Sequence, residues 1–298
     1  MALSFAPISQ NSIAFETFVE KVDKTVDSRS PLSLQECVAP LQELTNNDSF
    51  LTNIINTELS DLDNFQKGNA HSVQSLMLHR GSNYYIRLNA WPVLSIRPDV
   101  RVWQEYLYQY LKAHDHNFWF LTAGYFGLGY ETEIWEYDHD SILGFPGEKV
   151  EMKFLEKTSL PKGKAMLYRA STDIHCQYPP LEFSMSLNIM LMSADLLERE
   201  QFYFDTDRQE IIGNTNTSLS TRYLILELAS KFGDNNSAIL LENIAKNHKL
   251  PHVRMKGYQA LAKLKDDPIG IWEYAQRDGS RLVKETAKAN LSALKIIP

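Results

Sequence analysis

The sequence predicts an α+β protein in which a central antiparallel β region is flanked by helices on both sides. Apolar residues recur at three- and four-residue steps near both ends of the chain, whereas the middle third holds short segments rich in β-branched and aromatic residues. At 298 residues the chain is long enough for about two domains. We expect an N-terminal helical segment at 1–75, a β region at 76–195 and a C-terminal helical region at 196–298.

The composition excludes several classes of protein. Hydrophobic residues make up 44% of the chain and charged residues 22%, as in an ordinary globular protein. The formal charge of -7, without a dense run of Lys or Arg, argues against a nucleic-acid partner. The first residues lack the features of a secretory signal, and no apolar run approaches the roughly 18 residues of a membrane span. We therefore expect a cytoplasmic protein with no membrane partner. The presence of only two cysteines, Cys37 and Cys176, agrees with a reducing compartment.

Helical spacing of apolar residues runs from Asn11 to about Leu62. Two features interrupt it. Ser30-Pro31 places a proline where a helix can open, and the polar cluster at 46–49 is rich in capping residues. Three short helices are therefore expected before the β region.

Strands are expected from about Ser72 onward. Leu76–His79 and Tyr84–Leu88 flank a turn that contains Gly81 and Asn83, which predicts a hairpin. One brief helix is expected at Val102–Ala113. The other predicted strands are Asn117–Tyr125, Glu131–Asp138, Val150–Phe154, Ala165–Arg169 and Phe183–Met192. Short strands this closely spaced predict a small antiparallel sandwich or barrel, and we expect the strands to stop near Asp195.

The C-terminal region contains a repeated helical pattern. Its copies are Ser220–Ala229, Pro251–Leu261 and Ser280–Leu291. Aligning Arg222, Arg254 and Lys284 gives offsets of 32 and 30 residues. Helix pairs that cannot bury their apolar faces alone stack on their neighbours. The second copy resembles a short HEAT-type repeat, so we expect HEAT-like helices that bind a protein partner, form a homodimer or cap the β region.

Three histidines form the candidate metal site. His114 and His116 are two residues apart, and such residues on a strand point to the same face. His175 follows 59 residues after His116, at the end of a strand-turn segment. Three neutral imidazoles suit iron, zinc, copper or nickel better than calcium or magnesium. The alternative is a solvent-facing or hydrogen-bonded histidine pair without a metal.

The histidine pattern resembles the cupin superfamily, in which an H-x-H pair on one barrel strand is completed by a histidine from a second motif. The resemblance covers about residues 76–195 and implies a cupin-type β-barrel. No Glu follows the pair by four or five residues, since Phe120 and Leu121 stand there; Glu133 is left as an open candidate for a fourth ligand. The three-histidine set looks most like cysteine dioxygenase and related thiol dioxygenases, which implies Fe(II) that binds dioxygen and substrate together.

Other side chains are expected to complete the site. Strand alternation sends Phe118 and Phe120 to the same face as the histidines, so the surroundings should be aromatic. Arg87 or Arg169 is a candidate for binding a substrate carboxylate, because a guanidinium can bind it through two parallel hydrogen bonds. Tyr168 and Gln177 are weaker candidates for proton transfer or for orienting a histidine ligand.

We therefore expect a mononuclear non-haem Fe(II) oxygenase that oxidises a small amino-acid-like or thiol substrate with O2. Zinc, nickel, manganese and copper are the alternative metals. One alternative function is a metal-dependent isomerase, lyase or hydrolase on the same scaffold. Another is a non-catalytic protein that senses a small ligand and binds a partner through its helical repeats. The sequence lacks the glycine-rich phosphate loops and the G-x-S-x-G motif, which argues against simple nucleotide-binding proteins and serine hydrolases.

Overall fold

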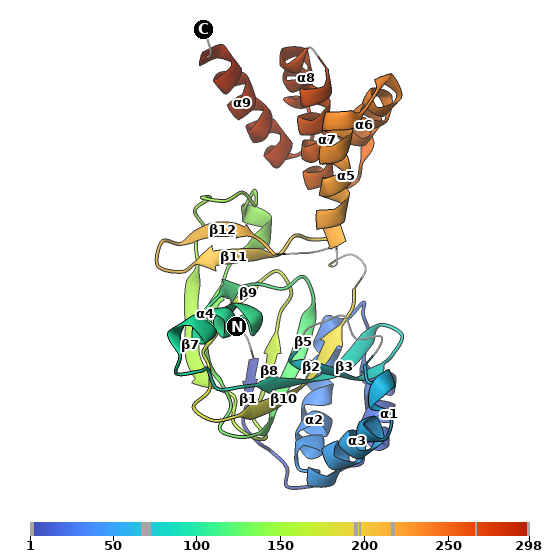
Figure 1. Ribbon diagram of the computed structural model, residues 1–298, viewed down its shortest axis with the longest axis vertical. Coiled ribbons are helices and arrows are strands. Elements are labelled where there is room, and N and C mark those ends of the chain that lie inside the picture. The colour runs from blue at the N-terminus through green and yellow to red at the C-terminus, as the bar shows by residue number, and fades with distance from the viewer. Residues whose placement is uncertain are drawn as a thin grey trace. The chain divides into compact units, whose positions relative to one another are not determined.

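The computed structural model describes residues 3–66, 73–193, 196, 198–215, 218–265 and 267–296. The chain divides into two compact units, Met1–Asn214 and Thr215–Pro298 (Figure 1). The first unit holds the N-terminal helices and the strands, and the second is helical. Mixed α+β architecture with antiparallel sheets is thus confirmed.

The N-terminal part of the first unit contains the three expected helices. They are α1 (Phe15–Thr25), α2 (Val38–Thr45) and α3 (Asp48–Ser60), with the 3₁₀ segments η1 (Pro31–Cys37) and η2 (Leu62–Asn64). The side chain of Asn47 caps α3, because its Oδ1 accepts hydrogen bonds of 3.1 Å from the backbone N–H groups of Ser49 and Phe50. These helices belong to the same compact unit as the strands, whereas the sequence suggests a separate segment.

Two antiparallel sheets make up the β region of the first unit. One has the order β1-β8-β5-β10-β3-β2, and we call it the first sheet; the second sheet has the order β12-β11-β4-β9-β6-β7. The strands of the first sheet are β1 (Leu3–Phe5), β2 (Ser75–Arg80), β3 (Tyr84–Trp91), β5 (Trp119–Phe126), β8 (Ala165–Tyr168) and β10 (Ser184–Leu191). Those of the second sheet are β4 (Ala113–His114), β6 (Glu131–Glu136), β7 (Lys153–Ser159), β9 (Asp173–Gln177), β11 (Phe202–Asp205) and β12 (Glu210–Asn214).

The two sheets are open layers. Within the described ranges, neither ladder of hydrogen bonds returns to its own first strand, so the sheets are not closed into the expected barrel. The expectation that strands stop near Asp195 is wrong, because β11 and β12 follow it; Asp195 itself lies outside the described residues.

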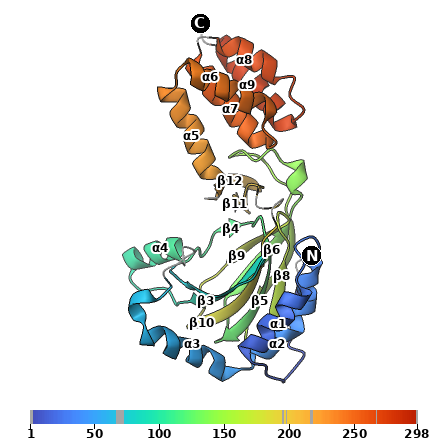
Figure 2. The same cartoon turned by 90° about the vertical axis from the view of Figure 1, so that its right-hand side faces the viewer.

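The central strands of the first sheet have two different faces. Ile86 and Leu88 of β3 pack with Phe18 and Leu41 from the N-terminal helices. Tyr85 and other residues on the opposite face pack in a second cluster with residues from β6 of the second sheet. Figure 2 shows α1 and α2 beside β5 and β10, on the side away from β4 and β9. The strand period of two thus separates a helix-covered face from an interior between the sheets.

The connection between β3 and β4 contains α4 (Pro98–Leu107), and the 3₁₀ segment η3 (His139–Ser141) follows β6. The sequence places the helix at Val102–Ala113, but α4 begins earlier, with Pro98 in its first turn. It also ends earlier, because Gln109 and Leu111 both adopt a φ of 58°, which a right-handed helix does not allow.

The second unit consists of helices in its described part. They are α5 (Ser218–Phe232), α6 (Asn235–Asn247), α7 (Pro251–Leu264), α8 (Pro268–Ala275) and α9 (Arg281–Ile296). The three predicted repeat segments lie on α5, α7 and α9, and α7 packs against both of the others. Arg254 of α7 forms two 2.8 Å hydrogen bonds to the Asp278 carboxylate just before α9. No helix in the described ranges is long and apolar enough to span a membrane.

Two glycines test the close packing of the first unit. Gly129 and Gly147 have φ values of 80° and 87°, in the left-handed region that favours glycine. A Cβ on Gly129 would lie 1.9 Å from the carbonyl oxygen of Leu160, whereas a Cβ on Gly147 would meet nothing within 4 Å. Gly147→Ala should lower the free energy of unfolding by about 1–2 kcal/mol through backbone strain, and Gly129→Ala by clearly more. Urea denaturation measures the free energy of unfolding of both variants. Equal losses would contradict the close packing of Gly129 against the backbone of Leu160.

Candidate metal centre

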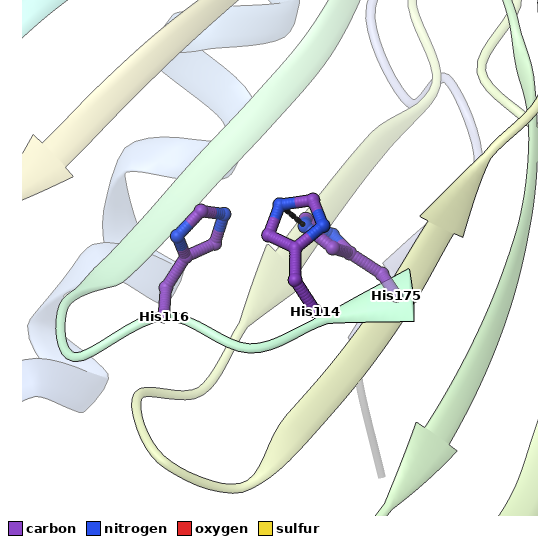
Figure 3. A group of neighbouring side chains, drawn as sticks. All are labelled: His114, His116 and His175. Atoms are coloured by element: carbon purple, nitrogen blue, oxygen red, sulfur yellow. Dashed lines mark hydrogen bonds between the residues drawn. The ribbon is translucent and has the colours of Figure 1, made fainter. Parts of the chain in front are cut away.

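The three histidines converge at two central strands of the second sheet. His114 is the last residue of β4, and it pairs directly with His175 on β9. His116 follows in the connection between β4 and β5 (Figure 3). The expectation that His114 and His116 share one regular strand is therefore wrong. The chain leaves the ladder at Asp115, and the carbonyl of His116 accepts a 2.7 Å hydrogen bond from the backbone N–H of Ser171.

The spacing of the imidazoles fits one metal ion. One nitrogen from each ring can be chosen so that the nitrogens lie within 4.8 Å of one another. The Nε2 atoms of His114 and His175 are 3.2 Å apart. Two imidazole nitrogens bound at about 2.0–2.1 Å to one ion are about 2.8–3.4 Å apart, the shorter values for octahedral and the longer for tetrahedral geometry. His114 and His175 thus already have the separation that a shared ion requires.

Hydrogen bonds to the other ring nitrogens set the tautomers. Nδ1 of His114 lies 2.8 Å from the carbonyl oxygen of Lys112, which can only accept, so this Nδ1 carries the proton. Nδ1 of His116 lies 3.3 Å from Oε1 of Gln201. The amide of Gln201 is oriented by its Nε2, which donates a 2.7 Å hydrogen bond to Oδ1 of Asn117. Both rings therefore present an unprotonated Nε2 for coordination.

Burial keeps the three imidazoles neutral. It lowers the pKa of His114, and it holds the pKa of His116 and His175 well below the ordinary value of 6.5. The other histidines of the group lower the pKa of His116 and His175 further, because two positive rings this close repel each other. Neutral imidazole is the form that binds a metal.

Asp115 anchors the segment between the two histidines. Its carboxylate accepts hydrogen bonds of 2.6 Å from the backbone N–H of Phe202 and 2.7 Å from the hydroxyl of Tyr137. Burial raises the pKa of Asp115 to about 7. Sequence reasoning missed Phe202 and Gln201, because they lie on or beside β11, in the part where no strand is expected. It also missed Tyr137, although that residue lies in a predicted strand.

Aromatic rings surround the histidines. The ring of Phe118 stacks on His116 with a centroid distance of 4.5 Å, and Phe120 lies edge-on to the same ring at 5.3 Å. Tyr168 stacks on Phe120 at 4.5 Å and lies 4.7 Å from His175. The candidate Tyr168 is thus beside the histidines. Gln177 is too, with its Nε2 3.3 Å from Nε2 of His175.

Glu133 does not face the histidines. It pairs in register with Cys176, whereas its neighbour Ile134 pairs with His175, so Glu133 lies on the opposite face of the sheet. Its carboxylate accepts a 2.8 Å hydrogen bond from Tyr178 and forms an ion pair with Lys157. The structure thus excludes Glu133 as a fourth ligand in this register.

The two candidate arginines have different surroundings. Arg169 binds the carboxylates of Asp173 and Glu136, each at 2.6 Å. Arg87 lies on β3 and makes no side-chain hydrogen bond or ion pair to any residue that the structure describes; its Nε is buried without a partner. It lies close enough to His116 to lower the pKa of that imidazole. Arg87 is therefore the arginine whose guanidinium is free to bind a ligand.

Acidification should destabilise the metal-free protein. The folded-state pKa values of the three histidines lie below 6.5, so the unfolded chain binds more protons, and stability present above about pH 6.5 is lost as the pH falls to 5. Each histidine contributes up to about 1.4 kcal/mol per pH unit. Asp115 opposes this, because its raised pKa gives stability at low pH that is lost as the pH rises through about 7. The three histidines outweigh the single aspartate, so the net effect of acidification is a loss of stability.

Urea denaturation at pH 7, 6 and 5 measures this dependence. His175→Gln removes one of the three titrating rings, so its stability should fall less steeply with pH than that of the unsubstituted chain. Identical slopes for the two proteins would show that buried neutral imidazoles do not control the acid response.

Comparison with known proteins adds little. No protein-family model matches the sequence, and no curated protein matches it. Similar solved structures include hydroquinone 1,2-dioxygenase from Sphingomonas sp. TTNP3 with 4-hydroxybenzoate bound, at 9% identity and a TM-score of 0.26, over 42% of this chain and 70% of that one. A second is hydroquinone 1,2-dioxygenase PnpCD with Cd2+ and 4-hydroxybenzonitrile, at 11% identity and a TM-score of 0.26, over 42% of this chain and 68% of that one. A third is Fe(II)-HppE with the alternative substrate (S)-1-HPP, at 11% identity and a TM-score of 0.21, over 60% of this chain and 99% of that one. Likeness at these TM-scores carries no argument about this chain.

Proposed function

We propose that the first unit is a mononuclear non-haem Fe(II) oxygenase that oxidises a small organic substrate with O2. The observation that carries the proposal is the group of three imidazoles at metal-binding distance, two of them buried and that of His116 partly buried, with no carboxylate among them. Zinc, nickel, manganese and copper suit the same nitrogen ligands, so the metal is part of the proposal. We also propose that the two sheets are an open form of the cupin arrangement, and that the C-terminal helices are HEAT-like repeats in a cytoplasmic protein.

The ligand set favours oxygen chemistry with an anionic substrate. A bound Fe(II) would supply open positions at which O2 and substrate meet, together with one-electron chemistry. Three neutral ligands leave the full dipositive charge of such an ion uncompensated. Anionic groups are therefore favoured as further ligands or neighbours, which fits an amino-acid-like or thiol substrate that carries a carboxylate.

The surrounding side chains would perform the other tasks. Arg87 would bind the substrate carboxylate, because it lies close enough to His116 to lower the pKa of that imidazole and has no counter-ion among the described residues. Phe118 and Phe120 would exclude water from the reacting groups. The hydroxyl of Tyr168, whose pKa is raised well above its ordinary value by burial, stays protonated and could donate a proton or hydrogen bond beside His175.

Arg169 is better suited to a positioning role than to substrate binding. Its guanidinium and its backbone N–H both bind the carboxylate of Asp173, the first residue of β9. This contact fixes the turn that leads into His175. We therefore assign substrate binding to Arg87 and orientation of β9 to Arg169.

Metal analysis tests the ligand set. Protein purified without chelator or metal-affinity tag should contain close to one equivalent of iron by mass spectrometry, and His116→Ala should lose it. His252→Ala, in the second unit, is the matched control and should keep the metal. If neither the unsubstituted protein nor the control binds metal after anaerobic addition of Fe(II), the proposed function fails.

Oxygen consumption tests the reaction class. A screen of thiol and amino-acid carboxylates should give metal-dependent O2 uptake, with KM raised roughly 10- to 100-fold in Arg87→Met because one charge-assisted contact is lost. Turnover that continues under strict anaerobiosis would point instead to the isomerase, lyase or hydrolase alternative. An unchanged KM in Arg87→Met would remove Arg87 from substrate binding.

A further inference from the structure

Three polar side chains form a row across neighbouring strands of the first sheet. Asn188 on β10 is the direct register partner of both Arg87 on β3 and Thr122 on β5. Directly opposed residues in an antiparallel sheet point to the same face, with Cβ atoms about 4.5–5.5 Å apart. Their chain neighbours Ile86 and Leu121 pack toward the N-terminal helices. The row, which we call the donor row, therefore faces the interior between the sheets.

The polar groups of the donor row are buried but poorly satisfied. Thr122 is 0% exposed, and its Oγ1 has no hydrogen-bond partner. Nε of Arg87 is buried in the same way. Asn188 is 3% exposed, and its Nδ2 makes three contacts that are all 3.5 Å long, at the limit of a hydrogen bond. A buried polar group without a partner costs about 1–3 kcal/mol. Two such groups, Nε of Arg87 and Oγ1 of Thr122, beside the weakly bonded amide of Asn188 indicate groups kept for a ligand.

No acidic side chain extends the row. Its register partners at the two ends are Met77, opposite Arg87, and Met166, opposite Thr122. Burial raises the pKa of the Tyr130 phenol, so it stays a protonated O–H; it lies near Arg87 and close enough to the Thr122 hydroxyl to interact with it, although the two do not reach hydrogen-bond distance. The unsatisfied groups can all donate hydrogen bonds, and the ends of the row are apolar.

The donor row lies next to a row of side chains that contacts the histidines. The adjacent row on the same strands includes Phe120, two residues from Thr122 and thus about 7 Å along the strand. The ring of Phe120 contacts His116 and His175, with centroid distances of 5.3 and 5.7 Å. Arg87 is partly exposed although β3 is paired on both sides.

We propose that Arg87, Asn188 and Thr122 together form a binding subsite for an oxyanion, the end of a small ligand whose other end reaches the three histidines. The chemistry that carboxylates, sulfonates and phosphates share is an oxygen-rich anion that accepts several hydrogen bonds at once, and the donor row supplies those hydrogen bonds from three strands. The role of this subsite in a reaction rests on the proposed oxygenase function, but anion binding to it does not.

Thr122→Val tests the subsite, because this substitution should raise the stability of the protein and weaken its binding of anions. Valine has nearly the same shape but no hydroxyl, so removing the unpaired Oγ1 should raise the melting temperature of the ligand-free protein. Anion binding should weaken roughly five- to tenfold through the lost hydrogen bond. The matched control is Thr45→Val, since Thr45 is also 0% exposed but donates a 2.7 Å hydrogen bond to the carbonyl of Gln42. It should lower the melting temperature and leave anion binding unchanged.

Binding is measured on the full chain by calorimetry with acetate, methanesulfonate and inorganic phosphate, at constant ionic strength against chloride. Metal-free protein is used first, so that anions cannot bind an ion at the histidines. At least one anion should bind the unsubstituted chain and Thr45→Val equally and Thr122→Val more weakly; the preferred anion separates planar from tetrahedral ligands.

Three results overturn the proposal: Thr122→Val melts lower, as Thr45→Val does; the anion binds Thr122→Val as tightly as the unsubstituted chain; or no anion binds. Metal binding without anion binding would remove the subsite and leave the oxygenase proposal standing. Anion binding in a protein that never takes up metal would support the subsite and contradict the oxygenase proposal.

Discussion

The pairing of His114 with His175 is the contact on which the site depends. β4 is only two residues long, and it is held between β9 and β11 in the second sheet. The carboxylate of Asp115 adds a further link, because it binds the backbone N–H of Phe202 at the start of β11. His116 can therefore lie outside the ladder and still face the other two imidazoles. The neighbouring strands β9 and β11, together with the buried carboxylate of Asp115, thus position all three rings although β4 is very short.

The helix-covered face of the first sheet allows its other face to hold polar groups. Residues such as Ile86 and Leu121 are fully buried against the N-terminal helices, and burying a large apolar side chain contributes roughly 1.5–3 kcal/mol. The opposite face contains Arg87, Asn188 and Thr122, and the unpaired Nε of Arg87 and Oγ1 of Thr122 oppose folding. Apolar clusters thus stabilise both faces of the sheet, and the side chains suited to ligand binding lie on the face turned away from the helices.

Much of this arrangement is predictable from local sequence, and the rest depends on register. The H-x-H pair, His175 and the β3 arginine can all be found from residue type and the period of two. The end of β4 at His114 cannot, because it is set by pairing with β9 and β11 rather than by nearby residues. β11 and β12 are short and follow a polar stretch, so local pattern does not reveal them, and Gln201 is missed with them. The face on which Glu133 lies follows from its pairing with Cys176, which local sequence does not contain.

Charge in the interior, rather than on the whole chain, would select the ligand. The protein carries a formal charge of -7, yet its candidate site combines three neutral imidazoles with one arginine that has no counter-ion among the described residues. Arg169 shows the contrast, since two carboxylates already neutralise it at the edge of the second sheet. In a poorly hydrated interior, the unpaired guanidinium of Arg87 attracts an anion strongly. The negative surface charges repel the anion less, because they are distant and water and salt screen them. An acidic protein can therefore contain a site for acidic ligands.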